Sequence, residues 1–360
     1  MTCFLLGSLA TLCLVASLMP FVPVAHGIFR IFDFCRLQIA AIAAVPLILT
    51  PVILPLNIYS YAFMGMSLVT IVIQLWYIIR FTPLWRKQSA NYNPDRRNAT
   101  TFSLLVCNVK QGNEDHSRLA RLIEKHDPDI VVLMETDQAW LNSLASVLDR
   151  YEFDLSCPQD NSYGMHLASR LKMLKGDIKF LLNEKIPSFH CLLEIENGHT
   201  FEMISIHPDP PIPHEDTIGR DAEILLAGKL AAKRRHPMII TGDLNDVAWS
   251  ETTRRFLRIS RLLDPRQGRG MYNTFDARVP FLRWPLDHIF HSEEFELVSI
   301  SREPSVGSDH FPMFYKFSLV YENGNSLPEK PTEEDFEDAE SLISTEKNRP
   351  RNPIGEDWED

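Results

Sequence analysis

The chain has 360 residues, a length that fits one large domain or two smaller ones. Its formal net charge is −11, but residues 328–360 alone hold twelve acidic residues against four Lys or Arg, so the rest of the chain is close to neutral. This balance speaks against the wide basic surface of a protein that binds duplex nucleic acid tightly, although locally clustered charge leaves nuclease action open. The acidic segment, residues 323–360, is expected to be a disordered tail.

The first 81 residues form an apolar segment. Residues 1–29 and 37–79 contain no Asp, Glu, Lys or Arg. A helix needs about 20 apolar residues to cross a bilayer, so the first stretch is long enough for one span and the second for two. A cleaved signal peptide is the alternative for the first stretch, but the start of the chain lacks the basic residues of such peptides. We therefore expect a membrane anchor, residues 1–81, with three transmembrane helices at about 4–25, 37–56 and 58–79.

The positions of Lys and Arg near the spans predict their orientation. These residues lie between the first two spans and after the third: Arg30, Arg36, Arg80, Arg86, Lys87, Arg96 and Arg97. With three spans, both groups fall on one side of the membrane, which should be the cytoplasm. The globular body is then cytoplasmic, and an error of one span would reverse this orientation.

The remaining sequence predicts a linker and an α/β body. Residues 82–100 are rich in Asn and Arg and contain two prolines, a composition typical of a linker. Residues 101–322 form the body, in which apolar runs predict strands and helical periodicity predicts helices. The expected strands include 102–109, 130–134, 189–195, 200–206 and 238–241, and the expected helices are 117–126, 138–148 and 215–233. This order indicates a mixed sheet core with helices outside.

Polar residues stand at the ends of these apolar strands or in later turns, where a rigid sheet could hold them at one rim. They are Asn108, Glu135, His207, Asp243, Asn245, Asp246, Asp287, Asp309 and His310. Carboxylate and amide oxygens without thiolates suit a hard cation such as Mg²⁺ or Mn²⁺. Such a cation offsets the charge of a phosphoester, and a His–Asp pair can orient and deprotonate the attacking water.

The ordered set of motifs resembles the endonuclease/exonuclease/phosphatase (DNase I-like) superfamily, and in particular its membrane-anchored bacterial branch. The motifs are Asn108, Glu135, His207, Gly242-Asp243-Leu244-Asn245, Leu286-Asp287-His288 and Gly307-Ser308-Asp309-His310-Phe311-Pro312. The resemblance covers about residues 101–320. It implies a four-layer α/β sandwich and, with the apolar segment, an integral protein of the bacterial inner membrane.

The resemblance also implies roles for these residues. Glu135 would be the principal metal ligand, and Asn108 and Asp309 would complete or support the metal site. His310, paired with Asp287, would activate the water or hold the phosphate, and Asp243 would orient or deprotonate the nucleophile. Asn245 would bind the phosphoryl oxygens, and His207 would contact the phosphate and assist the leaving group. Whether Asp243 or His310 is the base stays open.

Single residues in this set also have ordinary explanations. Asn108 could cap a strand end, His207 could belong to a proline-rich turn, and Asp309 could belong to a capped turn. His288 is expected to be a surface residue of its strand, and His166 stands where relatives carry an apolar residue. Further substrate-side candidates are Arg170, Arg220 and Trp284.

The function that these patterns favour is Mg²⁺-dependent hydrolysis of a phosphodiester, either in nucleic acid or in a lipid or other small molecule. A phosphomonoesterase of the same fold and a catalytically inactive membrane scaffold or sensor are the alternatives. The expected partners are the phosphoester substrate and the lipid bilayer. The sequence indicates no protein partner.

Overall fold

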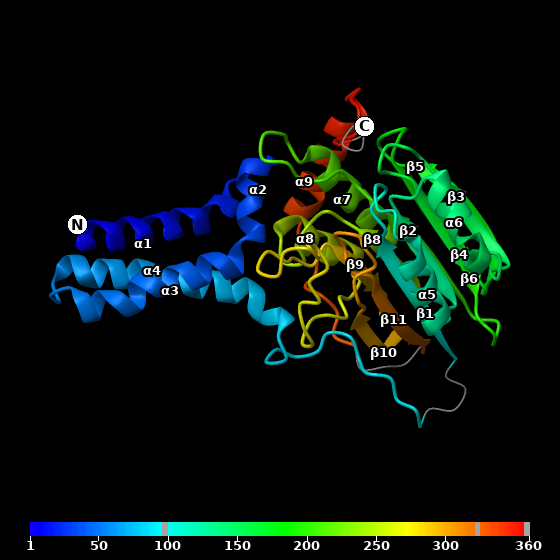
Figure 1. Cartoon of the computed structure of the whole chain (residues 1–360), viewed down its shortest axis with the longest axis horizontal. Coiled ribbons are helices and arrows are strands. Elements are labelled where there is room, and N and C mark those ends of the chain that lie inside the picture. Colours follow the sequence, from blue (N-terminus) through cyan, green and yellow to red (C-terminus); the bar gives the residue numbers. More distant parts are fainter. Residues whose placement is uncertain (96–99, 321–324, 356–360) are drawn as a thin grey trace. The chain divides into compact units, whose positions relative to one another are not determined.

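The computed structural model describes residues 1–95, 100–320 and 325–355 (Figure 1). Backbone contacts divide the chain into two compact units: residues 1–86 together with 211–217, and residues 87–210 together with 218 onward. Parts of the predicted linker and of the predicted tail, residues 96–99, 323–324 and 356–360, lie outside the described residues.

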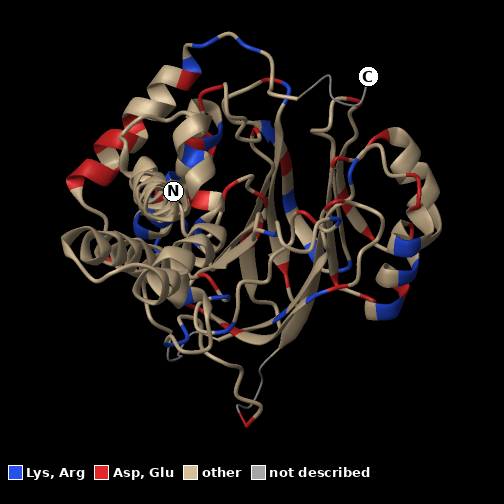
Figure 2. Ribbon diagram, turned by 60° about the vertical axis from the view of Figure 1, so that its left-hand side comes forward, with Lys and Arg blue, Asp and Glu red and all other residues tan. Residues whose placement is uncertain are grey.

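The first unit consists of helices that carry few charged residues and are drawn mostly tan in Figure 2. Its elements are α1 (Thr2–Leu18), η1 (Met19–Phe21), α2 (Gly27–Phe34), α3 (Arg36–Ile53), α4 (Ile58–Ile78) and η2 (Ile79–Phe81). Three segments, Thr2–Phe21, Arg36–Ile53 and Ile58–Phe81, are long and apolar enough to cross a membrane. The sequence therefore placed all three helices, with ends shifted by a few residues, and missed the short helix α2.

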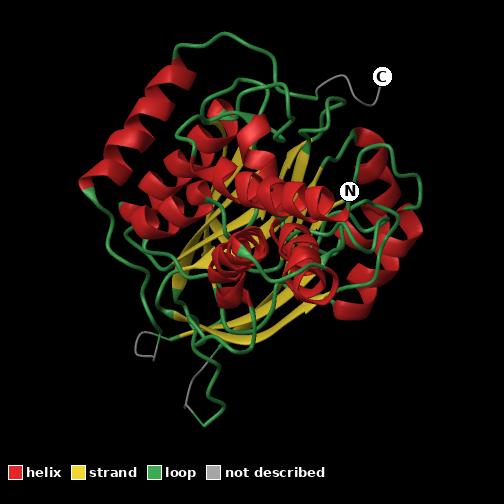
Figure 3. Ribbon diagram, turned by 90° about the vertical axis from the view of Figure 1, so that its left-hand side faces the viewer, coloured by secondary structure: helices red, strands yellow, loops and turns green. Residues whose placement is uncertain are grey.

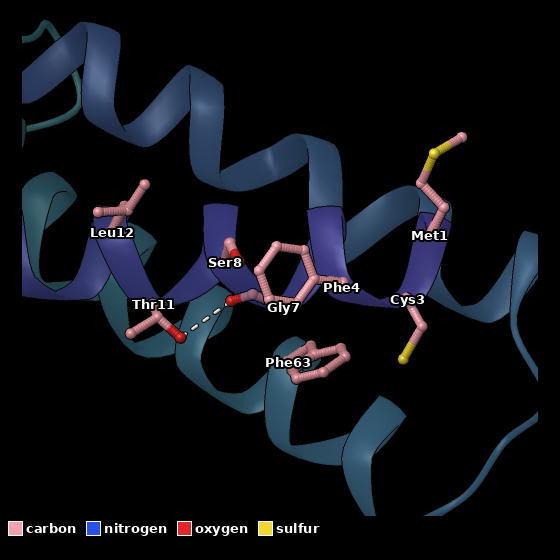
Figure 4. Close-up of a pocket in the computed structure, with 8 residues that line it drawn as sticks. All are labelled: Met1, Cys3, Phe4, Gly7, Ser8, Thr11, Leu12 and Phe63. Atoms are coloured by element: carbon pink, nitrogen blue, oxygen red, sulfur yellow. Dashed lines mark hydrogen bonds between the residues drawn. The ribbon is translucent and has the colours of Figure 1, made fainter.

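Small and polar side chains hold the three long helices together. Gly7 of α1 faces Phe63 of α4, and a Cβ at Gly7 would lie 2.6 Å from the Phe63 ring (Figure 4). Small residues allow this close approach between apolar helices. At the other end of the helices, buried Arg36 donates to Gln74 Oε1 at 3.0 Å, and Gln74 Nε2 donates to Ser17 Oγ at 2.7 Å. This chain of hydrogen bonds joins α3, α4 and α1.

The second unit contains two β-sheets, drawn yellow in Figure 3, with helices on their outer faces. The six-stranded sheet has the order β10 (Phe295–Arg302), β11 (Met313–Leu319), β1 (Thr101–Asn108), β2 (Ile130–Met134), β4 (Met165–Ser169) and β3 (Phe153–Cys157). The five-stranded sheet has the order β5 (Lys172–Phe180), β6 (Pro187–Glu194), β7 (Thr200–Ile206), β8 (Met238–Asp243) and β9 (Asp287–His291).

Apolar side chains fill three layers of this unit. Between the sheets, the rings of Phe102 and Phe201 stack with centroids 4.7 Å apart. The outer face of the six-stranded sheet is covered by α5 (His116–His126) and α6 (Gln138–Leu148). The outer face of the other sheet is covered by α7 (Ile218–Ala232) and α8 (Glu251–Ser260), and α9 (Glu333–Lys347) packs against these two helices. Each fully buried Leu or Phe contributes about 1.5–3 kcal/mol, so these layers dominate the stability of the unit. The predicted four-layer α/β sandwich is confirmed.

Strand register brings the strand ends of each sheet together. β1 and β2 are parallel, with Asn108 beside Met134, so Asn108 and Glu135 leave the sheet at the same edge. In the second sheet, β7 and β8 are parallel, with Ser205 beside Thr241, and Asp287 at the start of antiparallel β9 pairs with Asp243. Parallel neighbours end on the same side, which is why residues far apart in the sequence share one rim.

The prediction of a disordered acidic tail is wrong for the described residues 325–355. Thr332 and Asp335 form a capping box at the start of α9, and Asp335 also accepts hydrogen bonds from Arg258 at 2.9 and 2.6 Å. Ala339 and Ile343 are buried on the same helix face. Although the segment is acidic, α9 has a narrow apolar stripe on one face. Burial of this stripe is enough to bind α9 to α7 and α8.

The predicted linker also needs correction, because residues from Lys87 onward belong to the second unit. Ser89 Oγ lies 2.8 Å from His291 Nε2, and Leu297 N donates to Ala90 O at 2.9 Å. The unit therefore starts well before residue 101 and continues well beyond residue 322. A shorter protein limited to residues 98–322 would lack α9 and would therefore expose part of the apolar core.

We expect Asp335→Ala to lower the free energy of unfolding by about 1–3 kcal/mol, because it removes a helix cap and charged hydrogen bonds. Hydrogen bonds from Arg258 outweigh the effect of burial and hold the pKa of Asp335 below its usual value. The stabilisation is therefore present at neutral pH and is lost as the pH falls through the folded-state pKa. Thermal unfolding in detergent at pH 7 and at lower pH checks this, with exposed Glu337→Ala as the control. An unchanged midpoint at pH 7 would contradict the proposed anchoring of α9.

Candidate active site

The side-chain amide of Asn108 joins the two sheets at the rim. Its Nδ2 donates to Glu135 Oε1 at 2.6 Å and to Asp243 Oδ2 at 3.0 Å, so one group contacts a carboxylate from each sheet. Its Oδ1 accepts a hydrogen bond from Lys110 N at 3.0 Å. Asn108 is fully buried, and these bonds use the polar atoms of its side chain.

The carboxylate of Glu135 lies among other acids. Burial raises the pKa of Glu135 to about 7, although the hydrogen bond from Asn108 opposes this, and the charges of Asp309 and Asp243 raise it further. Burial and the neighbouring acids both disfavour the charged form of this carboxyl group. Glu135 is thus placed where a bound cation would be stabilised.

His310 and Asp287 form a buried pair. His310 Nδ1 lies 2.8 Å from Asp287 Oδ2, and His310 Nε2 lies 3.4 Å from Asp243 Oδ2. Burial by itself would lower the pKa of His310, but the charges of Asp287 and Asp243 together outweigh it and raise the pKa to about 10. The imidazole is therefore cationic at neutral pH. The predicted His–Asp pairing is present in the structure.

His207 approaches Asp243 on the same rim. Its Nε2 lies 3.9 Å from Asp243 Oδ2, and burial lowers the pKa of His207, so this ring is neutral at neutral pH. Asn245 N donates to Asp243 Oδ1 at 2.9 Å, and Asn245 Nδ2 donates to Pro208 O at 3.0 Å. Two buried histidines therefore lie within 4 Å of Asp243, one with a raised and one with a lowered pKa.

Asp309 lies at the more open side of the cluster and pairs with two cations that the sequence analysis did not single out. Lys110 Nζ is 3.0 Å and Arg278 Nη2 is 3.3 Å from Asp309 Oδ2. Lys110 follows Asn108 by two residues, a local signal that could have been noticed. Arg278 lies in a loop whose position depends on the tertiary fold.

Backbone strain accompanies these positions. Lys110, Glu135 and Asn245 all have left-handed φ angles, at 58°, 61° and 51°, although none is a glycine. Gly242 has φ 143°, and a Cβ there would lie 1.9 Å from Ile206 O, so only glycine fits between β7 and β8. Such conformations cost about 1–3 kcal/mol each and persist only where the surroundings fix them.

Not every sequence candidate belongs to this cluster. His288 is fully buried, with Nδ1 2.6 Å from Arg266 Nη2 and Nε2 2.8 Å from Asp246 O, so the surface assignment is wrong. Asp246 itself accepts hydrogen bonds from the hydroxyl groups of Ser250 and Thr253, so its carboxylate is bound at the start of α8. His166 is buried within β4, and burial lowers its pKa, which fits a structural residue.

The three substrate-side candidates also have other contacts. Arg170 pairs with Asp127 at the end of α5. Arg220 is buried and donates to Asn245 O at 3.0 Å, so it fixes the backbone of a site residue and has almost no exposed surface for substrate. Trp284 stacks on Phe275, with centroids 6.3 Å apart, and the Phe275 ring lies 4.9 Å from the His310 ring.

Two groups of residues in the cluster could hold a cation. Asp243, Asp287 and His310 offer ligand atoms that lie within 4.8 Å of one another. In that group, however, Asp287 already bonds His310, whose positive charge would repel a cation. The side with Glu135 and Asp309 offers carboxylate oxygens, which suit a hard divalent ion, and a cation there would share Asp309 with Lys110 and Arg278. Asn108 would join it after a half-turn of its amide, which exchanges Oδ1 and Nδ2.

The sequence profile of the Endonuclease/Exonuclease/phosphatase family matches residues 105–310, which contain all the residues of this cluster. The chain belongs to this family. Membership indicates a hydrolase that acts on phosphoesters. No match was found among curated protein sequences.

Solved structures resemble the part of this chain that the family profile matches. D. rerio TDP2 complexed with single-strand DNA product is 17% identical, with a TM-score of 0.50, and the match covers 61% of this chain and 99% of that one. A family protein from Bacteroides thetaiotaomicron is 20% identical, with a TM-score of 0.47, covering 62% of this chain and 99% of that one. At these identities the likeness concerns the fold alone.

We expect Mn²⁺ to raise the thermal unfolding midpoint of the full chain in detergent, because a ligand at about 100 times its Kd adds about 2.7 kcal/mol. Glu135→Gln should remove most of this shift, whereas exposed Glu114→Gln should keep it. If Asp287→Asn removes the shift and Glu135→Gln does not, the cation binds the Asp243, Asp287 and His310 group instead.

Proposed function

We propose that this protein is a membrane-tethered, divalent-metal-dependent phosphoesterase that hydrolyses a phosphodiester by attack of an activated water. The observation that carries the proposal is the Asn108 amide between Glu135 and Asp243, with the His310–Asp287 pair 3.4 Å from the same Asp243 oxygen. Acid, amide and imidazole groups thus meet at one point, as phosphoryl transfer to water requires.

In the proposed mechanism, Asp243 is the base. His310 is paired with Asp287 and carries a positive charge, so it suits binding of the anionic phosphoryl oxygens better than removal of a proton. Asp243 would take a proton from water while the water oxygen bonds to phosphorus and the bond to the leaving oxygen breaks. The sequence left the base open between Asp243 and His310, and the proposal assigns this role to Asp243.

The other site residues would bind the substrate and the leaving group. Asn245, held by its bond to Pro208, would remain close to the phosphoryl oxygens. Neutral His207 would donate a hydrogen bond to the leaving oxygen, which finally takes up a proton from solvent. Glu135 and Asp309, with Asn108, would hold Mg²⁺ or Mn²⁺, which when bound neutralises charge on the phosphate and on the leaving oxygen.

An exposed apolar loop beside the site favours an amphiphilic phosphodiester over duplex DNA. Ala277 N donates to Asp309 O at 2.7 Å, which fixes the start of this loop at the site. Farther along, Phe281 is 87% exposed and Leu282 is 44% exposed. Apolar side chains next to Arg278 suit a substrate with an apolar part and an anionic phosphate. A substrate panel distinguishes this activity from that of a phosphomonoesterase and from an inactive scaffold.

We expect the full chain in detergent to hydrolyse a phosphodiester with Mg²⁺ and to lose this activity in EDTA. The panel comprises phospholipid, plasmid DNA, RNA and inositol phosphates, with phospholipid expected to be the best substrate. Glu135→Ala should abolish turnover, and His310→Ala or His207→Ala should lower kcat by roughly 10²–10⁴-fold.

His199→Ala, at an exposed turn, serves as the control and should leave kcat unchanged. Metal-independent turnover, or none on any substrate, would overturn the enzymatic proposal. Preference for a terminal phosphate would instead indicate a phosphomonoesterase.

We further propose the membrane-anchored bacterial branch of the family, with the catalytic unit in the cytoplasm and the N-terminus outside. The support is the basic residues that follow the apolar segment Ile58–Phe81, such as Arg86 and Lys87. Green fluorescent protein fused after residue 360 should fluoresce, and alkaline phosphatase fused there should be inactive. Deleting residues 1–22 as a control should leave both results unchanged, because the two remaining spans still place both groups of basic residues on the same side. An active alkaline phosphatase fusion to the intact chain would refute this orientation.

A further inference from the structure

Residues 351–354, which follow α9, lie beside the strand end that carries His207. Ile354 N donates to Asp209 Oδ1 at 2.9 Å, and Tyr163 Oη donates to Ile354 O at 2.6 Å. Asn183 Nδ2 adds a bond to Arg351 O at 3.2 Å. Both backbone and side chains therefore fix residues 351–354 on the catalytic unit.

Arg351 is the cation of this contact. Its guanidinium meets both carboxylate oxygens of Asp209, and its Nε donates to Glu346 Oε1 at 2.7 Å. Asp209 is only 2% exposed. Burial raises the pKa of neighbouring Glu223, and the charge of Asp209 raises it further. Without Arg351, Asp209 would be a buried charge beside another acid, an arrangement that costs several kcal/mol unless the carboxylate moves.

Asp209 is two residues from His207, and the contacts around it reach the histidine directly. Tyr163 Oη also lies 3.2 Å from Asp209 Oδ1, and the Tyr163 ring lies 5.5 Å from the His207 ring. On the other side, Pro208 O accepts the bond from Asn245. Residues 207–209 are thus held between the catalytic cluster and the C-terminal segment.

Gly219 in the first turn of α7 makes room for this arrangement. A Cβ at Gly219 would lie 1.8 Å from Arg351 Nη2 and 2.8 Å from Asp209 Oδ2. Gly219 therefore leaves free the space that the Arg351 guanidinium occupies.

We propose that Arg351 is a positioning residue for His207: by holding Asp209 it fixes the turn that presents the imidazole to Asp243 and the substrate. The inference rests on the proposed role of His207 in phosphoester hydrolysis. It makes the C-terminal segment, which lies beyond the residues matched by the family profile, a working part of the active site.

The test uses the full chain in detergent, with bis-p-nitrophenyl phosphate and Mg²⁺. Arg351→Ala should lower kcat by roughly 10–100-fold with little change in KM, because small misplacements of a catalytic group have effects of this size. Gly219→Ala should act in the same direction, since it displaces the guanidinium without shortening Arg351. Arg351→Lys should recover part of the activity.

A double-mutant cycle separates positioning from a general loss of structure. In a His207→Ala background, Arg351→Ala should change kcat by less than about 2-fold. Arg349→Ala is the matched control, because Arg349 pairs with Glu346 at 3.7 Å and lies two residues earlier in the same segment. Full additivity of the two losses, or unchanged kcat in both Arg351→Ala and Gly219→Ala, would overturn the proposal.

A second measurement does not depend on turnover. In histidine-labelled protein, the ring signal of His207, assigned by its loss in His207→Ala, should shift in Arg351→Ala and Gly219→Ala but not in Arg349→Ala. An unshifted signal in both variants would also overturn the inference. If wild-type protein hydrolyses no phosphoester while the signal shifts as expected, the proposed function fails and the positioning contact stands.

Discussion

The structure of the site depends on one constraint: several carboxylates must be kept side by side in a largely dry place. Asp243 and Asp287 are buried next to each other across β8 and β9, and Glu135 faces them from the other sheet. Neighbouring carboxylates repel one another strongly in a medium of low dielectric constant. The Asn108 amide and the His310 imidazolium lie where they offset that repulsion, so each forms part of the fold as well as part of the site.

The sandwich makes this arrangement possible because each sheet contributes one pair of parallel strands. β1 and β2 deliver Asn108 and Glu135, and β7 and β8 deliver His207 and Asp243. The aromatic and aliphatic core between the sheets fixes the distance between the two pairs. Strained backbone at Lys110, Glu135 and Asn245 is tolerated because the strands leading to these residues are rigid.

The second unit is larger than the part of the chain that the family profile matches. Residues 87–92 pair with the six-stranded sheet and with β9, and α9 with the following segment covers α7 and α8 and reaches Asp209. Both additions lie outside the part matched by the family profile. An acidic segment that would be soluble as a free tail thus acts as a structural cover, held by Arg255, Arg258 and its own capping box.

The sequence by itself determined the features that depend on local pattern. The bounds of β2 and β7, the three apolar helices and the polar residues at strand ends follow from hydrophobic runs, because such runs reflect which backbone must be buried. Only the tertiary structure decided that Asn108 donates to two carboxylates, that His310 is charged while His207 is neutral, and that His288 is buried. Those properties arise from contacts between segments tens to hundreds of residues apart, which sheet register sets and local composition does not encode. The same reason explains α9: its buried positions, Ala339 and Ile343, become a helical stripe only when α7 and α8 are there to receive them.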